Sequence, residues 1–208
     1  SQALVTVINM ATRQVMGGTR WPFDIRDDGE LTFEAPISST ETLISSGDDT
    51  LAFATSEAEH DVITGQPSRM LITTSSGYPN SSYRIVSASR SAPNTVAKIS
   101  PGALEFGTSQ SVEVFANQSR LPATVRQVLS VRHEERPLKM QFVERHIDFD
   151  SVIPRDHERV GDPEIVYVGG LVSDTFDSDD ATAADTGLGI AVWPRPESKV
   201  FLRFSYVY

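Results

Sequence analysis

The sequence predicts an all-β fold, an antiparallel β-barrel or a sandwich of many short strands. Short runs rich in Val, Ile, Thr, Phe and Tyr recur along the 208 residues and are bounded by Gly, Pro, Asn, Asp and Ser, which is the pattern of strands and turns. No helical periodicity persists for three turns, and the 12 prolines are spread along the chain, where they would interrupt long helices. We expect at most one short helical turn, near Ser56–His60.

The expected strands follow one another at regular spacing, and turn-forming pairs such as Asp28-Gly29 and Pro93-Asn94 separate them. The ranges are Leu4–Met10, Leu31–Ala35, Leu51–Thr55, Arg69–Thr74, Tyr83–Ser89, Thr95–Ile99, Ser111–Ala116, Ala123–Arg132, Leu138–Phe149, Glu164–Val172, Gly187–Trp193 and Lys199–Tyr208.

The last of these strands is apolar on both faces. Alternate residues from Val200 to Tyr208 form one apolar face, and Phe201 and Val207 lie on the other with charged and polar neighbours. We expect this strand to be central in its sheet and covered on both sides, in part by a second subunit.

Other strands carry local signals. Ala123–Arg132 alternates as a strand with one solvated face does, with Leu129 expected inward. In Leu138–Phe149 the apolar positions change parity, which predicts a β-bulge near Glu144 or Arg145. Gly169-Gly170 has no helix after it and is interpreted as a bulge or tight turn.

The chain is predicted to form a single domain over residues 1–208. No internal repeat is evident, and the Ser/Thr-rich stretch Ser38-Ser39-Thr40 is interpreted as a linker between strands. A small subdomain over residues 36–66 is left open. Both ends of the sequence lie in strand-like stretches, as expected of a domain cut from a longer chain.

Composition excludes several classes of function. The net charge of −10 and the pI of about 4.8 argue against nucleic acid and against anionic membrane surfaces, because both require a basic face. The absence of cysteine rules out disulfides and thiolate zinc sites, and mildly favours synthesis in a reducing cytosol, or a bacterial or viral origin. No apolar run approaches the roughly 20 residues that cross a bilayer. We expect a soluble domain without membrane insertion.

One constellation has the residue types of acid/base or metal chemistry. His146, Asp148 and Asp150 alternate along one strand, so their side chains share a face. Ile147 and Phe149 occupy the other face and are expected to point inward, which makes the polar row a solvated surface in the preferred interpretation. The alternative is a carbohydrate-active or metal-dependent hydrolase that uses this row.

A second constellation is an acidic stretch, and carboxylates crowded in this way are suited to calcium. The stretch lacks the turn glycine and the terminal Glu of an EF-hand, so a solvated loop is the preferred interpretation and no metal or other cofactor is predicted. Its members are Asp174, Asp177, Asp179, Asp180 and Asp185.

A third feature is a loop composed for recognition. Hydroxyl groups beside an aromatic ring suit adaptable binding of protein or glycan surfaces. The same composition is ordinary in loops. The candidate receptor- or glycan-binding residues are Ser75, Ser76, Tyr78, Asn80 and Ser82.

The chain is acidic, free of cysteine and dense in expected strands, its loops are rich in Ser, Thr and Asn, and it closes with the strand Phe201-Leu202-Arg203-Phe204-Ser205-Tyr206-Val207-Tyr208. In these features it resembles the spike domain of an astrovirus capsid protein of the avian, turkey type. The resemblance implies a β-barrel-cored projection that forms a homodimer on the virion surface. It implies binding to a host-cell receptor, display of epitopes for neutralising antibodies, and assembly in the host cytoplasm. It brings no catalytic residues.

The preferred hypothesis is thus a non-enzymatic viral surface spike that mediates attachment. An adhesin or lectin-like module from a phage or a bacterium has the same physics, and the sequence that flanks this chain would separate the two. The hydrolase is the third hypothesis.

Overall fold

The computed structural model describes residues 25–43, 49–73, 82–100, 110–135, 140–143, 159–180 and 185–208. The predicted all-β class is confirmed: most of the described chain lies in strands, antiparallel pairings dominate, and α2 is the one described helix. The strands do not form one closed barrel, because they divide into three sheets. No helix in the described ranges is long and apolar enough to span a bilayer.

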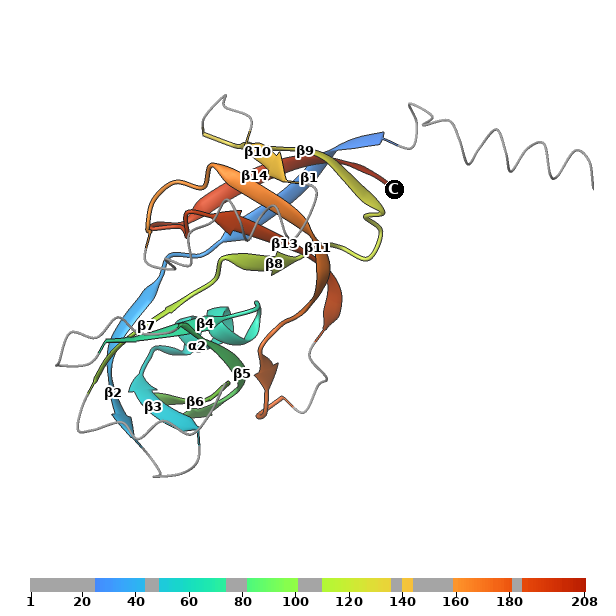
Figure 1. The fold of residues 1–208 in the computed structure, drawn as a ribbon. Coiled ribbons are helices and arrows are strands. Elements are labelled where there is room, and N and C mark those ends of the chain that lie inside the picture. Colours follow the sequence, from blue (N-terminus) through green and yellow to red (C-terminus); the bar gives the residue numbers. More distant parts are fainter. Residues whose placement is uncertain are drawn as a thin grey trace, which may run out of the picture.

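Two of the sheets lie face to face and form what we call the sandwich region, at the top of Figure 1. One sheet has the order β1-β14-β9 and the other the order β10-β11-β13-β8. The bounds are β1 Ile25–Phe33, β8 Gln118–Arg120, β9 Gln127–His133, β10 Gln141–Val143, β11 Ile165–Ser173, β13 Thr186–Trp193 and β14 Val200–Val207.

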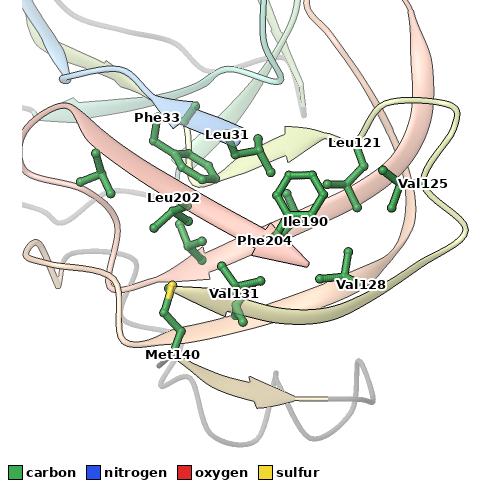
Figure 2. Packing of buried hydrophobic residues seen from close by; sticks show 14 residues of the cluster. Leu31, Phe33, Leu121, Val125, Val128, Val131, Met140, Ile190, Leu202 and Phe204 are labelled. Atoms are coloured by element: carbon green, nitrogen blue, oxygen red, sulfur yellow. The ribbon is translucent and has the colours of Figure 1, made fainter. Parts of the chain in front are cut away.

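The core of the sandwich region is a continuous layer of apolar side chains from both sheets. Figure 2 shows the Phe33 ring beside Leu31, and the Phe204 ring beside Leu121 and Ile190. Both rings are almost completely buried, at 0% and 2% exposure. Large rings packed between two sheets bury more apolar surface per residue than the aliphatic side chains around them.

The remaining strands and α2 form the inserted region, at the bottom of Figure 1. Its sheet has the order β12-β5-β4-β7-β2-β3-β6. Because β5 also pairs with β6, the pairings run in a continuous ring through β5, β4, β7, β2, β3 and β6. The bounds are β2 Ile37–Leu43, β3 Thr50–Ala54, α2 Glu57–Thr64, β4 Arg69–Thr73, β5 Ser82–Ser91, β6 Asn94–Ser100, β7 Gln110–Phe115 and β12 Phe176–Asp177.

Helix α2 is longer than the single turn that the sequence suggested, and a capping box forms its N-terminus. Ser56 caps the N-terminus: its hydroxyl accepts from the backbone N–H of Glu59, and the Glu59 carboxylate accepts from the backbone N–H of Ser56. This reciprocal capping box satisfies amide groups that would otherwise lack partners. The helix buries Ile63 and His60 against the inserted region.

The two regions are tied together by chain crossings and by contacts that include an ion pair between Arg195 and Glu113. The chain leaves the sandwich region after β1, returns after β7, leaves again after β11 to form β12, and returns to β13. Arg195, which follows β13, donates two hydrogen bonds of 2.8 and 2.7 Å to the carboxylate of Glu113 in β7. Its guanidinium also lies over the ring of Phe115, 4.5 Å from the ring centre.

Some predicted details are corrected. The pair Asp28-Gly29 is not a turn but an irregularity within β1, where the register to β14 shifts between Arg26 and Gly29. A Cβ atom on Gly29 would lie 2.6 Å from the Phe204 ring, so a glycine is needed for the ring to pack there. The stretch interpreted as a linker, Ser38-Ser39-Thr40, belongs to β2 and pairs with β7.

Two predictions, the central position of β14 and the bulge at Gly169-Gly170, are confirmed. Strand β14 is central in its sheet, as expected. Within this chain its second face is charged and partly solvated: Arg203 donates to Glu134 at 2.6 Å and lies 3.7 Å from Glu30. The expected cover by a second subunit stays a prediction. Gly169 and Gly170 form the predicted bulge, because two residues of β11 oppose one of β13 there.

Candidate functional site

Most of the residues that the sequence nominated as a site lie outside the described residues. Of the five recognition candidates only Ser82 is described. It is buried at the start of β5, where its side chain and carbonyl oxygens accept hydrogen bonds from Arg69, so it positions that arginine instead of facing solvent. The residues that are not described are Ser75, Ser76, Tyr78, Asn80, His146, Asp148 and Asp150, together with the bulge expected near Glu144 and Arg145.

The acidic stretch does not act as one unit. Arg120 of β8 binds its two ends, with Asp174 at 3.3 Å and Asp185 at 2.9 Å. Burial raises the pKa of Asp174 despite the opposing effect of Arg120. The middle of the stretch lies elsewhere, since β12 pairs with β5 and carries Asp177 and Asp179 to the inserted region.

A pocket of about 210 Å³ lies between the two regions. The inserted region contributes Pro67, Ser68, Arg69 and Arg84, and the sandwich region contributes Gln118, Leu171, Val172 and Ser173. This volume is below the roughly 300 Å³ at which pockets for drug-sized ligands begin. It suits a single sugar ring or one acidic substituent.

Two arginines give the pocket its charge. Arg69 and Arg84 are directly opposite each other in the β4–β5 pairing. Desolvation lowers the pKa of Arg69, and the like charge of Arg84 lowers it further. Among the described residues neither guanidinium has a carboxylate partner. Two adjacent cations without a counter-ion favour an anionic ligand.

The walls of this pocket are held by hydrogen bonds across the region boundary. The hydroxyl of Thr175 donates to the carbonyl of Gln66 at 3.1 Å and accepts from the backbone N–H of Ser68 at 3.3 Å. Leu171, which directly follows the bulge in β11, stands at the rim with 79% of its surface exposed. The pocket thus combines polar and charged lining residues with an exposed apolar side chain at its edge.

A second cluster lies in the inserted region. His60, Asp177 and Asp179 bring one imidazole nitrogen and two carboxylate oxygens within 4.8 Å of one another. Nε2 of His60 is 3.8 Å from Oδ2 of Asp177, and the imidazole is buried, whereas Asp179 is exposed. Nδ1 of His60 is hydrogen-bonded to the Thr95 hydroxyl at 3.0 Å. Imidazole and carboxylate are the ligands that divalent transition-metal ions accept.

Sequence reasoning missed both groupings, for a physical reason. The arginine pair depends on the register of β4 with β5, and the His60 cluster joins residues more than a hundred positions apart. The only local signal was the acidic stretch that contains Asp177 and Asp179. Comparisons of this chain with models of known protein families, with curated proteins and with solved structures find no match.

Proposed function

We propose that this chain is a non-enzymatic spike of a viral capsid surface, which attaches to a host-cell receptor as a homodimer and carries antigenic epitopes. The sequence resemblance to the astrovirus spike domain motivates the viral assignment, and the all-β architecture is compatible with it. The proposal assigns no catalytic step to any residue.

The observation that carries the attachment role is the pocket at the region boundary. Its paired guanidinium groups of Arg69 and Arg84 are suited to the carboxylate or sulfate of an acidic glycan. Arg69 is pre-positioned by three hydrogen bonds to Ser82, so binding would immobilise little additional side chain. A receptor that ends in an acidic sugar is therefore the proposed ligand.

A glycan array tests this proposal directly. We expect the purified chain to bind sialylated or sulfated glycans and not their neutral counterparts. The Arg84→Ala variant should weaken that binding about tenfold, because it removes a charge-assisted hydrogen bond. Arg84 is exposed and lies within β5, so the substitution leaves the core intact.

Arg132→Ala is the matched control, since Arg132 is also an exposed strand arginine but lies in β9, away from the pocket residues. It should change binding less than twofold. Equal losses in the two variants would show that only the general charge matters, and binding confined to neutral glycans would remove the acidic-ligand assignment. Sedimentation equilibrium tests the dimer, and a strict monomer at high concentration would contradict the spike assignment.

A further inference from the structure

The starting observation is a buried nitrogen without a partner. His60 is 4% exposed, and among the described residues its Nε2 makes no hydrogen bond. The nearest carboxylate oxygen, Oδ2 of Asp177, is 3.8 Å away, too far for a hydrogen bond, which would require about 3 Å. A buried polar atom in this situation needs an explanation, and a bound ion is one that the surrounding carboxylates allow.

The 3.8 Å separation matches another kind of contact. Two ligands that are each about 2.1 Å from a tetrahedral zinc ion lie about 3.4 Å apart. A movement of a few tenths of an ångström would therefore place one ion between the imidazole and the carboxylate. Asp179 supplies a third ligand atom, which lies within 4.8 Å of the ligand atoms of His60 and Asp177.

Each carboxylate has one oxygen that accepts a hydrogen bond from a backbone N–H. The backbone N–H of Asp179 donates to Oδ1 of Asp177 at 2.9 Å, which leaves Oδ2 directed at His60. The backbone N–H of Arg90 donates to Oδ2 of Asp179. Anchoring of this kind orients metal ligands in known sites.

The imidazole is anchored in the same way from behind. Its Nδ1 is hydrogen-bonded to the Thr95 hydroxyl. The Thr95 hydroxyl is hydrogen-bonded to the Thr55 hydroxyl at 2.6 Å. The Thr55 hydroxyl also accepts a hydrogen bond of 2.8 Å from the Arg90 guanidinium. With the proton on Nδ1 donated to Thr95, the Nε2 lone pair points toward the carboxylates. This is the tautomer that a metal-bound histidine needs.

We propose that His60, Asp177 and Asp179 form a binding site for a divalent transition-metal ion, with Zn²⁺ as its preferred occupant. The imidazole ligand favours Zn²⁺ over Ca²⁺ and Mg²⁺, which take oxygen ligands. Two carboxylates balance the charge of the ion, and three protein ligands leave a position for water. The site is independent of the attachment function proposed above.

The bound ion would clamp a crossing segment. Asp177 and Asp179 belong to the stretch that arrives from β11 of the sandwich region, and His60 belongs to α2 of the inserted region. The ion would therefore fasten this stretch to the helix, only a few residues from the pocket wall at Leu171–Ser173. We expect it to stabilise the folded chain, because it binds the folded state alone.

Titration calorimetry with zinc chloride tests the site, on the 208-residue chain first dialysed against a chelator and then freed of it. We expect one high-affinity ion per chain and a higher melting temperature in its presence. Asp177→Asn and Asp179→Asn should each weaken binding at least tenfold. Asparagine keeps the oxygen that accepts the anchoring backbone hydrogen bond, so both variants should fold.

Asp180→Asn is the matched control, because it removes the same charge from the neighbouring residue, which is not one of the three ligands. It should retain the affinity within about twofold. A His60→Gln variant adds a spectroscopic readout: Co²⁺ bound to the unmodified chain should show the absorption of a low-coordinate nitrogen–oxygen site, and this absorption should be lost in the variant.

Three results would overturn the proposal. The first is the absence of Zn²⁺ binding to the folded chain. The second is equal weakening by the Asp177, Asp179 and Asp180 variants, which would indicate diffuse attraction to the acidic stretch. The third is tighter binding of Ca²⁺ or Mg²⁺ than of Zn²⁺, which would exclude the imidazole as a ligand.

Discussion

The sandwich region and the inserted region are both built from short strands, but they differ in what they bury. The sandwich region encloses an apolar layer centred on Phe33 and Phe204. The inserted region also has an apolar core, and beside it lies a buried polar chain of His60, Thr95 and Thr55. The inserted region thus pairs its buried imidazole with hydroxyl groups, whereas the buried imidazole of His133 in the sandwich region has no hydrogen-bond partner among the described residues.

This difference follows from how each region closes its core. Two facing sheets can fill the space between them with apolar side chains alone. In the inserted region the short helix α2 packs beside β5 and brings the polar His60 inward. Its imidazole must then be hydrogen-bonded, because a buried polar group without a partner is costly. The threonine pair supplies that bond.

The largest expected loss of stability comes from removing one buried ring from the core of each region. Phe204→Ala in the sandwich region and Phe53→Ala in the inserted region each remove a fully buried ring. Each should lower the free energy of unfolding by about 3–5 kcal/mol, since a cavity of that size collapses only partly. Urea titration followed by tryptophan fluorescence and by far-UV circular dichroism measures the loss.

The same pair of variants shows whether the two regions unfold together. If they are one cooperative unit, both substitutions shift a single transition that the two probes report alike. Two separate transitions, each displaced by only one of the variants, would show that the regions are independently stable. That result would contradict the single-domain prediction made from the sequence.

The next effect concerns the ion pair between the regions. Arg195→Ala leaves the carboxylate of Glu113 without its bidentate partner, and Glu113→Gln leaves a guanidinium that is 95% buried without its counter-charge. Each should cost about 3 kcal/mol, at the lower end for buried pairs because Glu113 is partly exposed.

The double variant separates the pair from its surroundings. If the ion pair is the main contribution, Arg195→Ala combined with Glu113→Gln should be less destabilising than the sum of the single effects. Strict additivity would assign the cost of losing Arg195 to its contact with the Phe115 ring instead. Thermal denaturation of all four proteins in one buffer provides the comparison.

Short strands rich in apolar and β-branched residues were predictable in the inserted region. The expected ranges Leu51–Thr55, Arg69–Thr74 and Thr95–Ile99 lie within one residue of the observed β3, β4 and β6 at each end. Their signal is local, because a short run of apolar and β-branched residues between turn residues can be recognised from the sequence itself.

The missed strands depend on partners that are distant in sequence. Strand β2 has few apolar residues, and its pairings with β7 and β3 hold it in the sheet. Leu129 was expected inward but is only half-buried, because the pairing of β9 with β14 is irregular there and Val128 takes the buried position. Local alternation does not reveal this bulge in β9, because it is defined by the register with β14.

The candidate sites were even less predictable than the strands. The sequence singled out Asp177 and Asp179 as acidic, but it could not join them to His60, which approaches them only through the parallel pairing of β12 with β5. Similarly, Arg69 and Arg84 become neighbours through strand register alone. Sites assembled from several elements require the fold first.

The smallest expected effect on the free energy of unfolding comes from the N-terminal cap of α2. Its pH dependence distinguishes the charge of the cap from its hydrogen bonds. Ser56→Ala removes the hydroxyl that caps the helix and should cost about 1 kcal/mol. Glu59→Gln keeps a side chain that can complete the capping box and removes only the charge near the helix N-terminus, so about 0.5 kcal/mol is expected near neutral pH.

The two variants should respond differently to acid. The backbone hydrogen bond from Ser56 lowers the pKa of Glu59, and the bond from the Ser56 hydroxyl adds to this. A carboxyl with a lowered pKa stabilises the folded state above its unfolded pKa of about 4.3 and loses that contribution as the pH falls through its folded pKa. The deficit of Glu59→Gln should therefore shrink as the pH falls below about 4.3, and it should be smaller at pH 3 than at pH 7. Ser56→Ala should keep part of its deficit there, because the cap on the Glu59 amide does not titrate. Urea titrations near pH 7 and pH 3 measure the loss of unfolding free energy in each variant. If the loss in Glu59→Gln is the same at both pH values, the charge of Glu59 does not contribute to the stability of this helix cap.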